Sequence, residues 1–208
     1  MSSITFRPCV RQDVDQAIGL IYSSGPAAFN YVFSQAGVSQ PLEFLRSAFL
    51  AGDSEFGFQQ HIAIERNGVL VGVGAVRYAC QQWGFTLSAF KHIWGSYSFL
   101  SVFPVMLRGL RTEAVIPPPK PDVGLLYHLG IAESERGQGL GKLLVEHLLE
   151  QIKQQGVHTA TLDVAASNPR AHALYKRLGF TDVLTREGGL KSKFGEVVDH
   201  TLMHYPLA

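Results

Sequence analysis

Apolar and polar positions recur along this chain with two spacings, one typical of helices and one typical of strands. The clearest helical stripe lies between residues 140 and 154, where leucine, valine and isoleucine recur three and four positions apart and charged side chains occupy the opposite side. This spacing predicts an amphipathic helix with a buried leucine face. Residues 123–131 form a mostly apolar run of strand length, typical of a strand covered on both faces.

The remaining pattern predicts a mixed α/β order with a strand hairpin at each end. Asn67-Gly68 separates two strand-like runs and is a strong hairpin signal. Asp13 is placed to cap the first helix, and Gly25 and Pro26 are placed to end it. We expect further helices at residues 13–23, 41–50 and 169–178, and further strands at residues 4–7, 61–66, 69–78, 159–164, 180–185 and 196–204.

Residues 80–121 fit this order poorly. The run from residue 92 to residue 107 has no charged side chain, but Gly95 and Pro104 interrupt it, and it is shorter than the roughly 20 apolar residues of a membrane span. We interpret the segment as a helical insertion packed on the domain or on a second subunit; a wall or lid of a substrate pocket stays an alternative. Residues 116–121, IPPPKP, predict a stiff connector. We expect one domain, residues 1–208, with an insertion at residues 80–121.

Composition and charge narrow the function classes. The chain has 208 residues, of which 46% are hydrophobic and 17% charged, enough to bury one core. Its formal net charge is +1, so no broad positive field would attract nucleic acid or an anionic membrane, and small molecules are the expected partners. Two cysteines cannot form a disulfide framework, and the opening residues lack a secretory pattern, so we expect a cytoplasmic protein.

Three glycines stand at every second position just before the leucine helix, in Arg136-Gly-Gln-Gly-Leu-Gly-Lys142. The amino end of a helix presents unpaired N–H groups, and glycine lets an anion approach them, so this turn predicts a phosphate site. A Walker loop would need glycine where Arg136 stands and a hydroxyl where Leu143 stands. The dinucleotide fingerprint G-x-G-x-x-G is also absent, because these glycines run G-x-G-x-G.

The pattern R-x-x-G-x-G after a buried strand resembles the acetyl-CoA loop of the GNAT N-acetyltransferase superfamily. Residues 168–180, NPRAHALYKRLGF, resemble that family's second signature, N-x-x-A-x-x-L-Y-x-x-x-G-F, at every fixed position. The resemblance covers residues 123–180; Arg7 and Asp13 are only loosely similar to the family, and residues 80–121 match no pattern. It implies an α/β fold with a mixed, mostly antiparallel central sheet, a splayed strand pair and helices on both faces.

The resemblance also implies the residues of the site. The splayed strand would pair its backbone with the pantetheine amides, the glycine turn would hold the pyrophosphate, and Asn168 would bond cofactor amides. Tyr175 would act as the catalytic acid that protonates the departing thiolate, and a backbone N–H near Ile131 would bind the developing oxyanion. The expected cofactor-binding residues are Leu129, Gly130, Ile131, Arg136, Gly137, Gln138, Gly139, Leu140, Gly141, Lys142, Asn168 and Tyr175.

The implied reaction is direct transfer of an acetyl group from acetyl-CoA to an amine of a small molecule or peptide. Its general base is not evident from the sequence. Strand alternation would place Leu125 and Tyr127 on the acceptor side and His128 on the opposite face. A water-mediated path to His61, Glu65 or Glu133 and an amine that arrives already neutral both stay open.

Other residues could shape an acceptor site. The aromatic residues Phe29, Tyr31, Phe33, Trp83, Trp94 and Tyr97 suit a pocket or a core, and Arg108 or Arg111 would suit a carboxylate. His200 and His204 share one face of a predicted strand, but nothing nearby completes a zinc ligand set, so we expect no metal.

Two other classes of protein stay open. A non-catalytic acyl-CoA-binding module is motivated by the missing base. A peripheral membrane protein is motivated by the apolar run from residue 92 to residue 107, which lacks a basic face. We expect no integral membrane association, and the apolar insertion suggests a homodimer.

Overall fold

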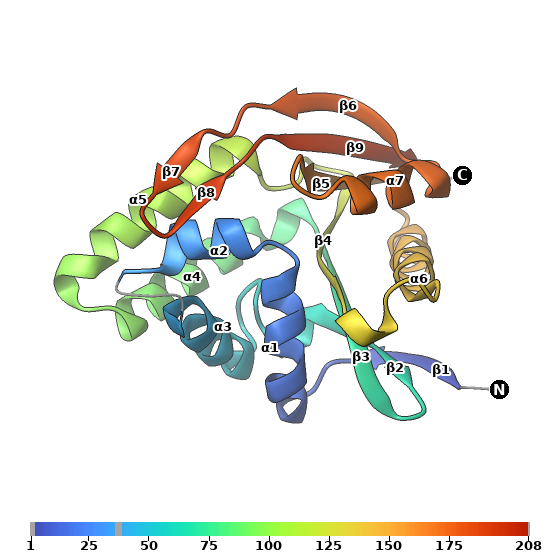
Figure 1. Cartoon of the computed structure of the whole chain (residues 1–208), viewed down its shortest axis with the longest axis horizontal. Coiled ribbons are helices and arrows are strands. Elements are labelled where there is room, and N and C mark those ends of the chain that lie inside the picture. The colour runs from blue at the N-terminus through green and yellow to red at the C-terminus, as the bar shows by residue number, and fades with distance from the viewer. Residues whose placement is uncertain (1–2, 36–38, 208) are drawn as a thin grey trace.

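The structure is a computed structural model that describes residues 3–35 and 39–207. A seven-stranded sheet runs through its centre in the order β1-β2-β3-β4-β5-β9-β6 (Figure 1). Its strands are β1 (Ile4–Pro8), β2 (His61–Arg66), β3 (Val69–Arg77), β4 (Gly124–Ile131), β5 (Thr159–Ala165), β9 (His200–Pro206) and β6 (Thr181–Arg186). A separate hairpin pairs β7 (Leu190–Ser192) with β8 (Gly195–Val197).

The centre of the sheet is splayed. Every neighbouring pair of strands is antiparallel except β4 and β5, which are parallel and pair only at Gly124 with Ala160 and at Leu125 with Thr161. Beyond Leu125 the two strands separate, so the later residues of β4 have no partner on the β5 side. The expected fold class, a mostly antiparallel mixed sheet with a splayed pair, is confirmed.

Helices cover both faces and make two cores. On one face, α6 (Leu140–Gln154) and α7 (Pro169–Leu178) bury leucine side chains together with Phe180. On the other face, α1 (Val14–Ser23), α2 (Pro26–Phe33) and α3 (Ser39–Ala51) bury Ile21, Phe33 and Phe49 (Figure 1). Because the stripe of α6 is continuous, its fully buried leucines anchor the glycine turn that precedes it.

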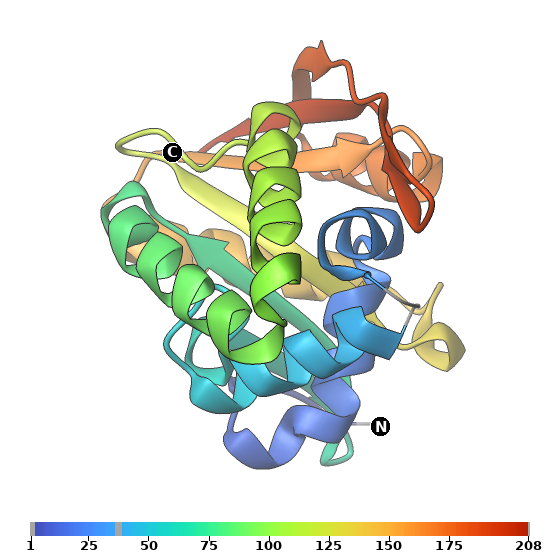
Figure 2. The same cartoon turned by 90° about the vertical axis from the view of Figure 1, so that its left-hand side faces the viewer.

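Residues 80–121 contain two helices, α4 (Gln82–Ser96) and α5 (Phe99–Val115), which lie nearest the viewer in Figure 2. Ile93, Val102 and Val105 on their inner sides join the core of α1, α2 and α3. Of the helices that the structure describes, none has both the length and the apolar character needed to cross a membrane.

Local details differ from the sequence prediction in three places. Asp13 does not cap α1 with its side chain, because its carboxylate accepts hydrogen bonds from Arg7 and from the Val10 N–H instead. Pro26 begins α2, in a stretch where no helix was predicted, since proline suits the first turn of a helix. The last predicted strand, residues 196–204, is divided between β8 and β9.

Candidate functional site

The glycine turn leads from β4 into α6. Gly137 and Gly139 have φ angles of +82° and +83°, a left-handed conformation that favours glycine. Gly139 is the N-cap of α6, and no side chain caps the helix. No side chain therefore competes with an anion for the N–H groups of its first turn.

A cavity of about 510 Å³ lies between this turn, the splayed part of β4 and α7. It is lined by ten of the residues predicted to bind the cofactor, namely Leu129, Gly130, Ile131, Arg136, Gly137, Gly139, Gly141, Lys142, Asn168 and Tyr175. Gln138 and Leu140 do not line it, since Gln138 bonds Arg66 and the Leu140 side chain is buried in the core. Their predicted role concerns backbone N–H groups only.

Two cations that sequence reasoning missed also line this cavity. Arg170 and Arg177 lie on α7 at variable positions of the second signature, so the motif gave no signal for them. The Arg170 guanidinium comes within 3.6 Å of the place where a Cβ on Gly137 would lie. Arginine suits phosphate recognition, so the cavity combines the N–H groups of the helix with the positive charge of these two guanidinium groups.

Asn168 and Tyr175 stand at the two ends of the cavity wall made by α7. Asn168 is the N-cap of this helix rather than part of it, and its Oδ1 accepts a hydrogen bond of 3.1 Å from the Ala171 N–H. The side-chain amide of Asn168 is left as a donor. Tyr175 is only 8% exposed, and burial raises its pKa to about 12, so the phenol stays protonated at neutral pH.

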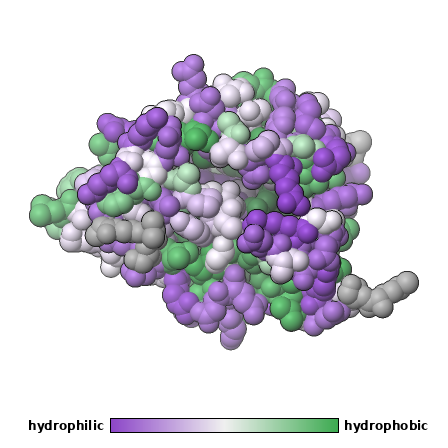
Figure 3. Space-filling view, viewed as in Figure 1, coloured by the Kyte–Doolittle hydropathy of each residue, from purple (hydrophilic) through white to green (hydrophobic). Residues whose placement is uncertain are grey.

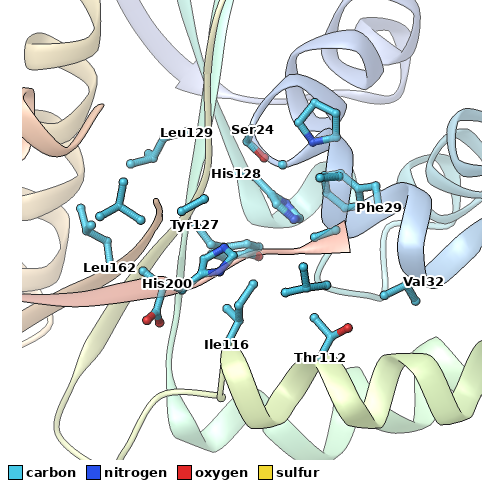
Figure 4. A pocket seen from close by; sticks show the side chains of 18 of the residues that line it. Ser24, Phe29, Val32, Thr112, Ile116, Tyr127, His128, Leu129, Leu162 and His200 are labelled. Atoms are coloured by element: carbon cyan, nitrogen blue, oxygen red, sulfur yellow. The ribbon is translucent and has the colours of Figure 1, made fainter. Parts of the chain in front are cut away.

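A second cavity, of about 550 Å³, adjoins the first (Figure 4). Leu129, Asn168 and Tyr175 line both cavities, so the predicted acid lies where the two meet. The second cavity is walled by β4 and α2 and also by the α4–α5 insertion, through Ile93, Thr112 and others. Residues 80–121 therefore pack on the domain as a helical insertion, which was the preferred interpretation, and they also form a wall of this cavity, which was the alternative.

His128 lies in this second cavity, contrary to the sequence expectation. In the pairing of β3 with β4, Val73 lies opposite Gly130 and Ala75 opposite Tyr127, which leaves His128 and Leu129 facing a single residue. This β-bulge has a φ angle of +52° at His128. The bulge interrupts alternation, so His128 lines the cavity together with its neighbours Leu126 and Tyr127, and Leu126 also packs among the leucines of α6.

A chain of hydrogen bonds holds the imidazole of His128. Nδ1 of His61 lies 2.8 Å from the Gly57 carbonyl, and Nε2 of His61 lies 3.1 Å from Nδ1 of His128. The two ring planes are parallel within 1°. Burial lowers the pKa of His61 to about 4. Burial also holds the pKa of His128 well below its ordinary value, followed by the electrostatic effect of the neighbouring His61 and by the positive charge of Arg77.

The other expected base candidates lie elsewhere. Glu65 is bound to Arg7, and neither it nor Glu133 lines the second cavity. Sequence reasoning missed Glu55, which does line that cavity and pairs with Arg77 at 2.5 Å. Burial has the largest effect and raises the pKa of Glu55, whereas the positive charge of Arg77 acts to lower it.

The remaining candidates divide between cavity, core and surface. Phe29 and Phe33 line the second cavity, Tyr31 is core, and Trp83 and Trp94 are exposed. Tyr97 donates a hydrogen bond to the Phe33 carbonyl. Neither Arg108 nor Arg111 lines the cavity, so they are not placed to bind a carboxylate there. His200 lines the cavity and donates from Nδ1 to the Val198 carbonyl; within residues 3–35 and 39–207 no cluster could ligate a metal.

Comparison with known proteins identifies the class of protein. The model of the acetyltransferase (GNAT) family matches residues 29–180, and the chain belongs to this family. It is 34% identical over 87 residues to ribosomal protein bS18-alanine N-acetyltransferase of Escherichia coli strain K12, covering 42% of this chain and 58% of that relative. The match therefore spans little more than half of the relative's length.

Solved structures share the fold. A crystal structure of an N-acetyltransferase from Staphylococcus aureus Mu50 has a TM-score of 0.71 at 15% identity and covers 97% of this chain and 100% of its own. A Salmonella typhimurium structure with its cofactor acetyl-CoA has a TM-score of 0.57 at 17% identity and covers 100% of this chain and 95% of its own. The resemblance inferred from the two signatures is thus confirmed at the level of family and fold.

Proposed function

We propose that this protein transfers an acetyl group from acetyl-CoA to an amine of a small molecule or peptide. One observation carries the proposal: Tyr175 lies at the junction of two cavities, one with an anion-binding turn and the other with a histidine held at its wall. Membership of the GNAT family supports acetyl-CoA as the acyl donor. We call the first cavity, at the glycine turn, the donor cavity and the second the acceptor cavity. Two such cavities that meet at a proton donor suit direct transfer.

The donor cavity fits the chemistry of a coenzyme with a pyrophosphate and an amide-containing arm. The N–H groups from Gln138 to Lys142 and the guanidinium of Arg170 would hold the pyrophosphate. The unpaired edge of β4 and the free side-chain amide of Asn168 would bind the amides of the arm. Acetyl-CoA supplies a thioester, whose acetyl carbon the amine attacks.

Tyr175 supplies the proton for the leaving group. As the new bond between nitrogen and acyl carbon forms and the bond between carbon and sulfur breaks, the phenol donates its proton to the thiolate. Because burial raises its pKa to about 12, Tyr175 keeps this proton throughout the neutral range.

His128 accepts the proton that the amine loses. The Gly57 carbonyl can only accept, so Nδ1 of His61 carries a hydrogen, and neutral His61 then accepts at Nε2 from Nδ1–H of His128. This leaves the lone pair on Nε2 of His128 available in the acceptor cavity. An amine becomes strongly acidic once its nitrogen bonds the acyl carbon, so a base with a low pKa suffices, and that low pKa keeps it unprotonated.

His128 as base predicts a specific pH dependence. Activity should fall as the pH drops through the depressed pKa of His128, because the protonated imidazole cannot accept a proton. His128→Gln should lower the rate by roughly 100-fold and remove this acidic limb. A variant that keeps the wild-type rate and limb would show that the proton leaves by another route.

The walls of the acceptor cavity favour an amine with an apolar or aromatic body, since Phe33, Phe56 and Ile93 line it. Phe29, Val32 and Ile116, labelled in Figure 4, line it as well. The Escherichia coli relative is named for an alanine of ribosomal protein bS18, so peptides that begin with alanine also belong among the test acceptors. A cytoplasmic location, no role for nucleic acid, and association of two copies of the chain complete the proposal.

The first experiment is calorimetric titration of the purified protein with acetyl-CoA and with desulfo-CoA. Thiol release is then followed with arylalkylamines, polyamines, aminoglycosides, amino acids and alanine-initiated peptides. Binding with release for at least one acceptor is expected. If acetyl-CoA binds and no amine is acetylated, the non-catalytic module becomes the better account, and absence of binding would refute both.

A further inference from the structure

The side of the α4–α5 insertion that faces away from the core is unusually apolar. On α4 it presents Trp83, Leu87, Phe90 and Trp94, at positions that share one side of a helix. On α5 it presents Phe99, Leu100, Phe103, Leu107 and Leu110. We call these nine residues the outer face. Their exposed fractions run from 41% for Phe90 to 85% for Trp83, although each is large and hydrophobic.

The outer face is one continuous surface rather than scattered side chains. The rings of Phe90 and Trp94 lie 5.8 Å apart, those of Trp94 and Phe99 lie 6.0 Å apart, and those of Phe99 and Phe103 lie 5.9 Å apart. This series of ring contacts passes from α4 to α5. Figure 3, in the view of Figure 1, shows this surface only edge-on, as apolar residues at the end of the molecule where α5 lies.

Its size matches a stable protein interface. Nine side chains of this kind at these exposures present on the order of 1,000 Å² of apolar surface. The largest apolar patch on an ordinary monomer is about 300–600 Å². A standard interface buries about 800 Å² on each partner, so the outer face alone is large enough to hold one.

Charges around the outer face do not favour an anionic lipid surface. Lys91 and His92 of α4 both pair with Asp53. The guanidinium of Arg108 is half-buried beside Tyr31 and Tyr97, which leaves Arg111 as a single exposed arginine next to the outer face. A peripheral segment that binds anionic lipid needs a rim of free cations, whereas a surface rich in tryptophan, phenylalanine and leucine resembles the centre of a protein interface.

We propose that the outer face binds the outer face of a second copy of this chain. A two-fold axis would pack each α4–α5 pair against its counterpart, so the same residues are buried on both sides. The inner sides of these helices line the acceptor cavity at Ile93 and Thr112. Pairing therefore holds that cavity wall in place, a consequence that rests on the proposed acetyl transfer, whereas the pairing itself does not.

Sedimentation equilibrium of the full chain tests the pairing. Wild type should sediment at twice the 22.8 kDa of one chain, and Leu100→Glu combined with Phe103→Glu should sediment at 22.8 kDa. Val183→Glu is the matched control, because Val183 is 55% exposed on β6, away from the outer face, and it should leave the dimer intact. Circular dichroism checks that each variant is folded.

Two results would overturn the proposal. One is a wild-type monomer at every concentration up to about 100 μM, a range in which a surface of this area should associate. The other is a dimer that persists in the folded double variant, which would place the contact elsewhere. Co-sedimentation of monomeric wild type with phosphatidylcholine vesicles, with or without phosphatidylglycerol, would instead assign the outer face to lipid. None of these measurements requires acetyl-CoA, so the pairing can be refuted while the proposed acetyl transfer stands, and the reverse.

If pairing is found, acceptor kinetics test its consequence. The double variant should show a raised KM for the acceptor and unchanged affinity for acetyl-CoA, whereas Val183→Glu should match wild type. Equal acceptor KM values in dimer and monomer would show that the cavity wall is rigid without its partner, and would remove that part of the inference.

Discussion

Mild acidification should destabilise this protein through His61. Its side chain is 1% exposed, and burial lowers its pKa from an ordinary 6.5 to about 4. The unfolded chain therefore binds a proton near pH 6.5 that the folded chain does not bind until about pH 4. Since the unfolded state holds more protons in this window, the free energy of unfolding must fall as the pH falls.

The magnitude follows from the pKa of His61 in the folded and unfolded chains. A tenfold change in proton affinity corresponds to about 1.4 kcal/mol, so His61 costs about 2 kcal/mol between pH 7 and pH 5 and about 3 kcal/mol by pH 4. This loss is a large fraction of the stability of an ordinary domain, about 5–15 kcal/mol.

Urea unfolding at pH 7, 6 and 5 measures this loss, with His61→Gln as the comparison. Glutamine does not titrate, but it can still donate to the Gly57 carbonyl and accept from His128. Groups away from this pair titrate alike in both proteins, so the difference between their slopes reports His61 together with its effect on the pKa of His128. Exposed His158→Gln should follow wild type. Parallel curves for wild type and His61→Gln would refute the reasoning, because they would mean that His61 is protonated in the folded state.

Three further changes test the site and its support. Tyr175→Phe should leave acetyl-CoA binding unchanged in calorimetry but slow thiol release by about 100-fold or more, and an undiminished rate would remove the tyrosine as acid. Gly130→Ala should cost about 2 kcal/mol in urea unfolding, since a Cβ there would lie 2.3 Å from the Leu20 carbonyl oxygen. Asp13→Ala should cost about 2 kcal/mol, because Asp13 is buried against Arg7 with two hydrogen bonds of 2.7 and 2.8 Å; a loss under about 0.5 kcal/mol would contradict a buried pair.

The donor side of the site could be predicted because its determinants are local in sequence. Helix α7 begins at Pro169 and ends at Leu178, as the sequence predicts, since proline suits a first turn and Gly179 has a φ angle of +102°. The glycine turn is likewise encoded by its own residues. Arg170 and Arg177 of α7 could not be predicted to line the donor cavity, because this depends on the tertiary packing of α7 beside the turn.

The acceptor side could not be predicted in the same way. Whether His128 faces the cavity depends on one extra residue in β4 opposite Gly74, and therefore on the pairing of strands about fifty positions apart. Its hydrogen-bond partner, His61, comes from a third strand, β2. Strict alternation of side chains along β4 places His128 on the wrong face of the sheet, because it assumes regular pairing with β3 and no bulge.

The bulge and the splay act together on one strand. Pairing with β5 ends at Leu125, which leaves one edge of β4 unpaired, and the bulge that begins three residues later, at His128, lets this histidine line the second cavity. An unpaired strand edge and a left-handed backbone conformation at His128 both cost free energy of folding. The close packing of α1 against Gly130 and the hydrogen bond from His61 to Gly57 offset that cost. The residues that hold β4 in this conformation thus also hold His128 in the cavity that Tyr175 lines, so under the proposed mechanism loosening either contact should impair catalysis before it impairs binding of acetyl-CoA.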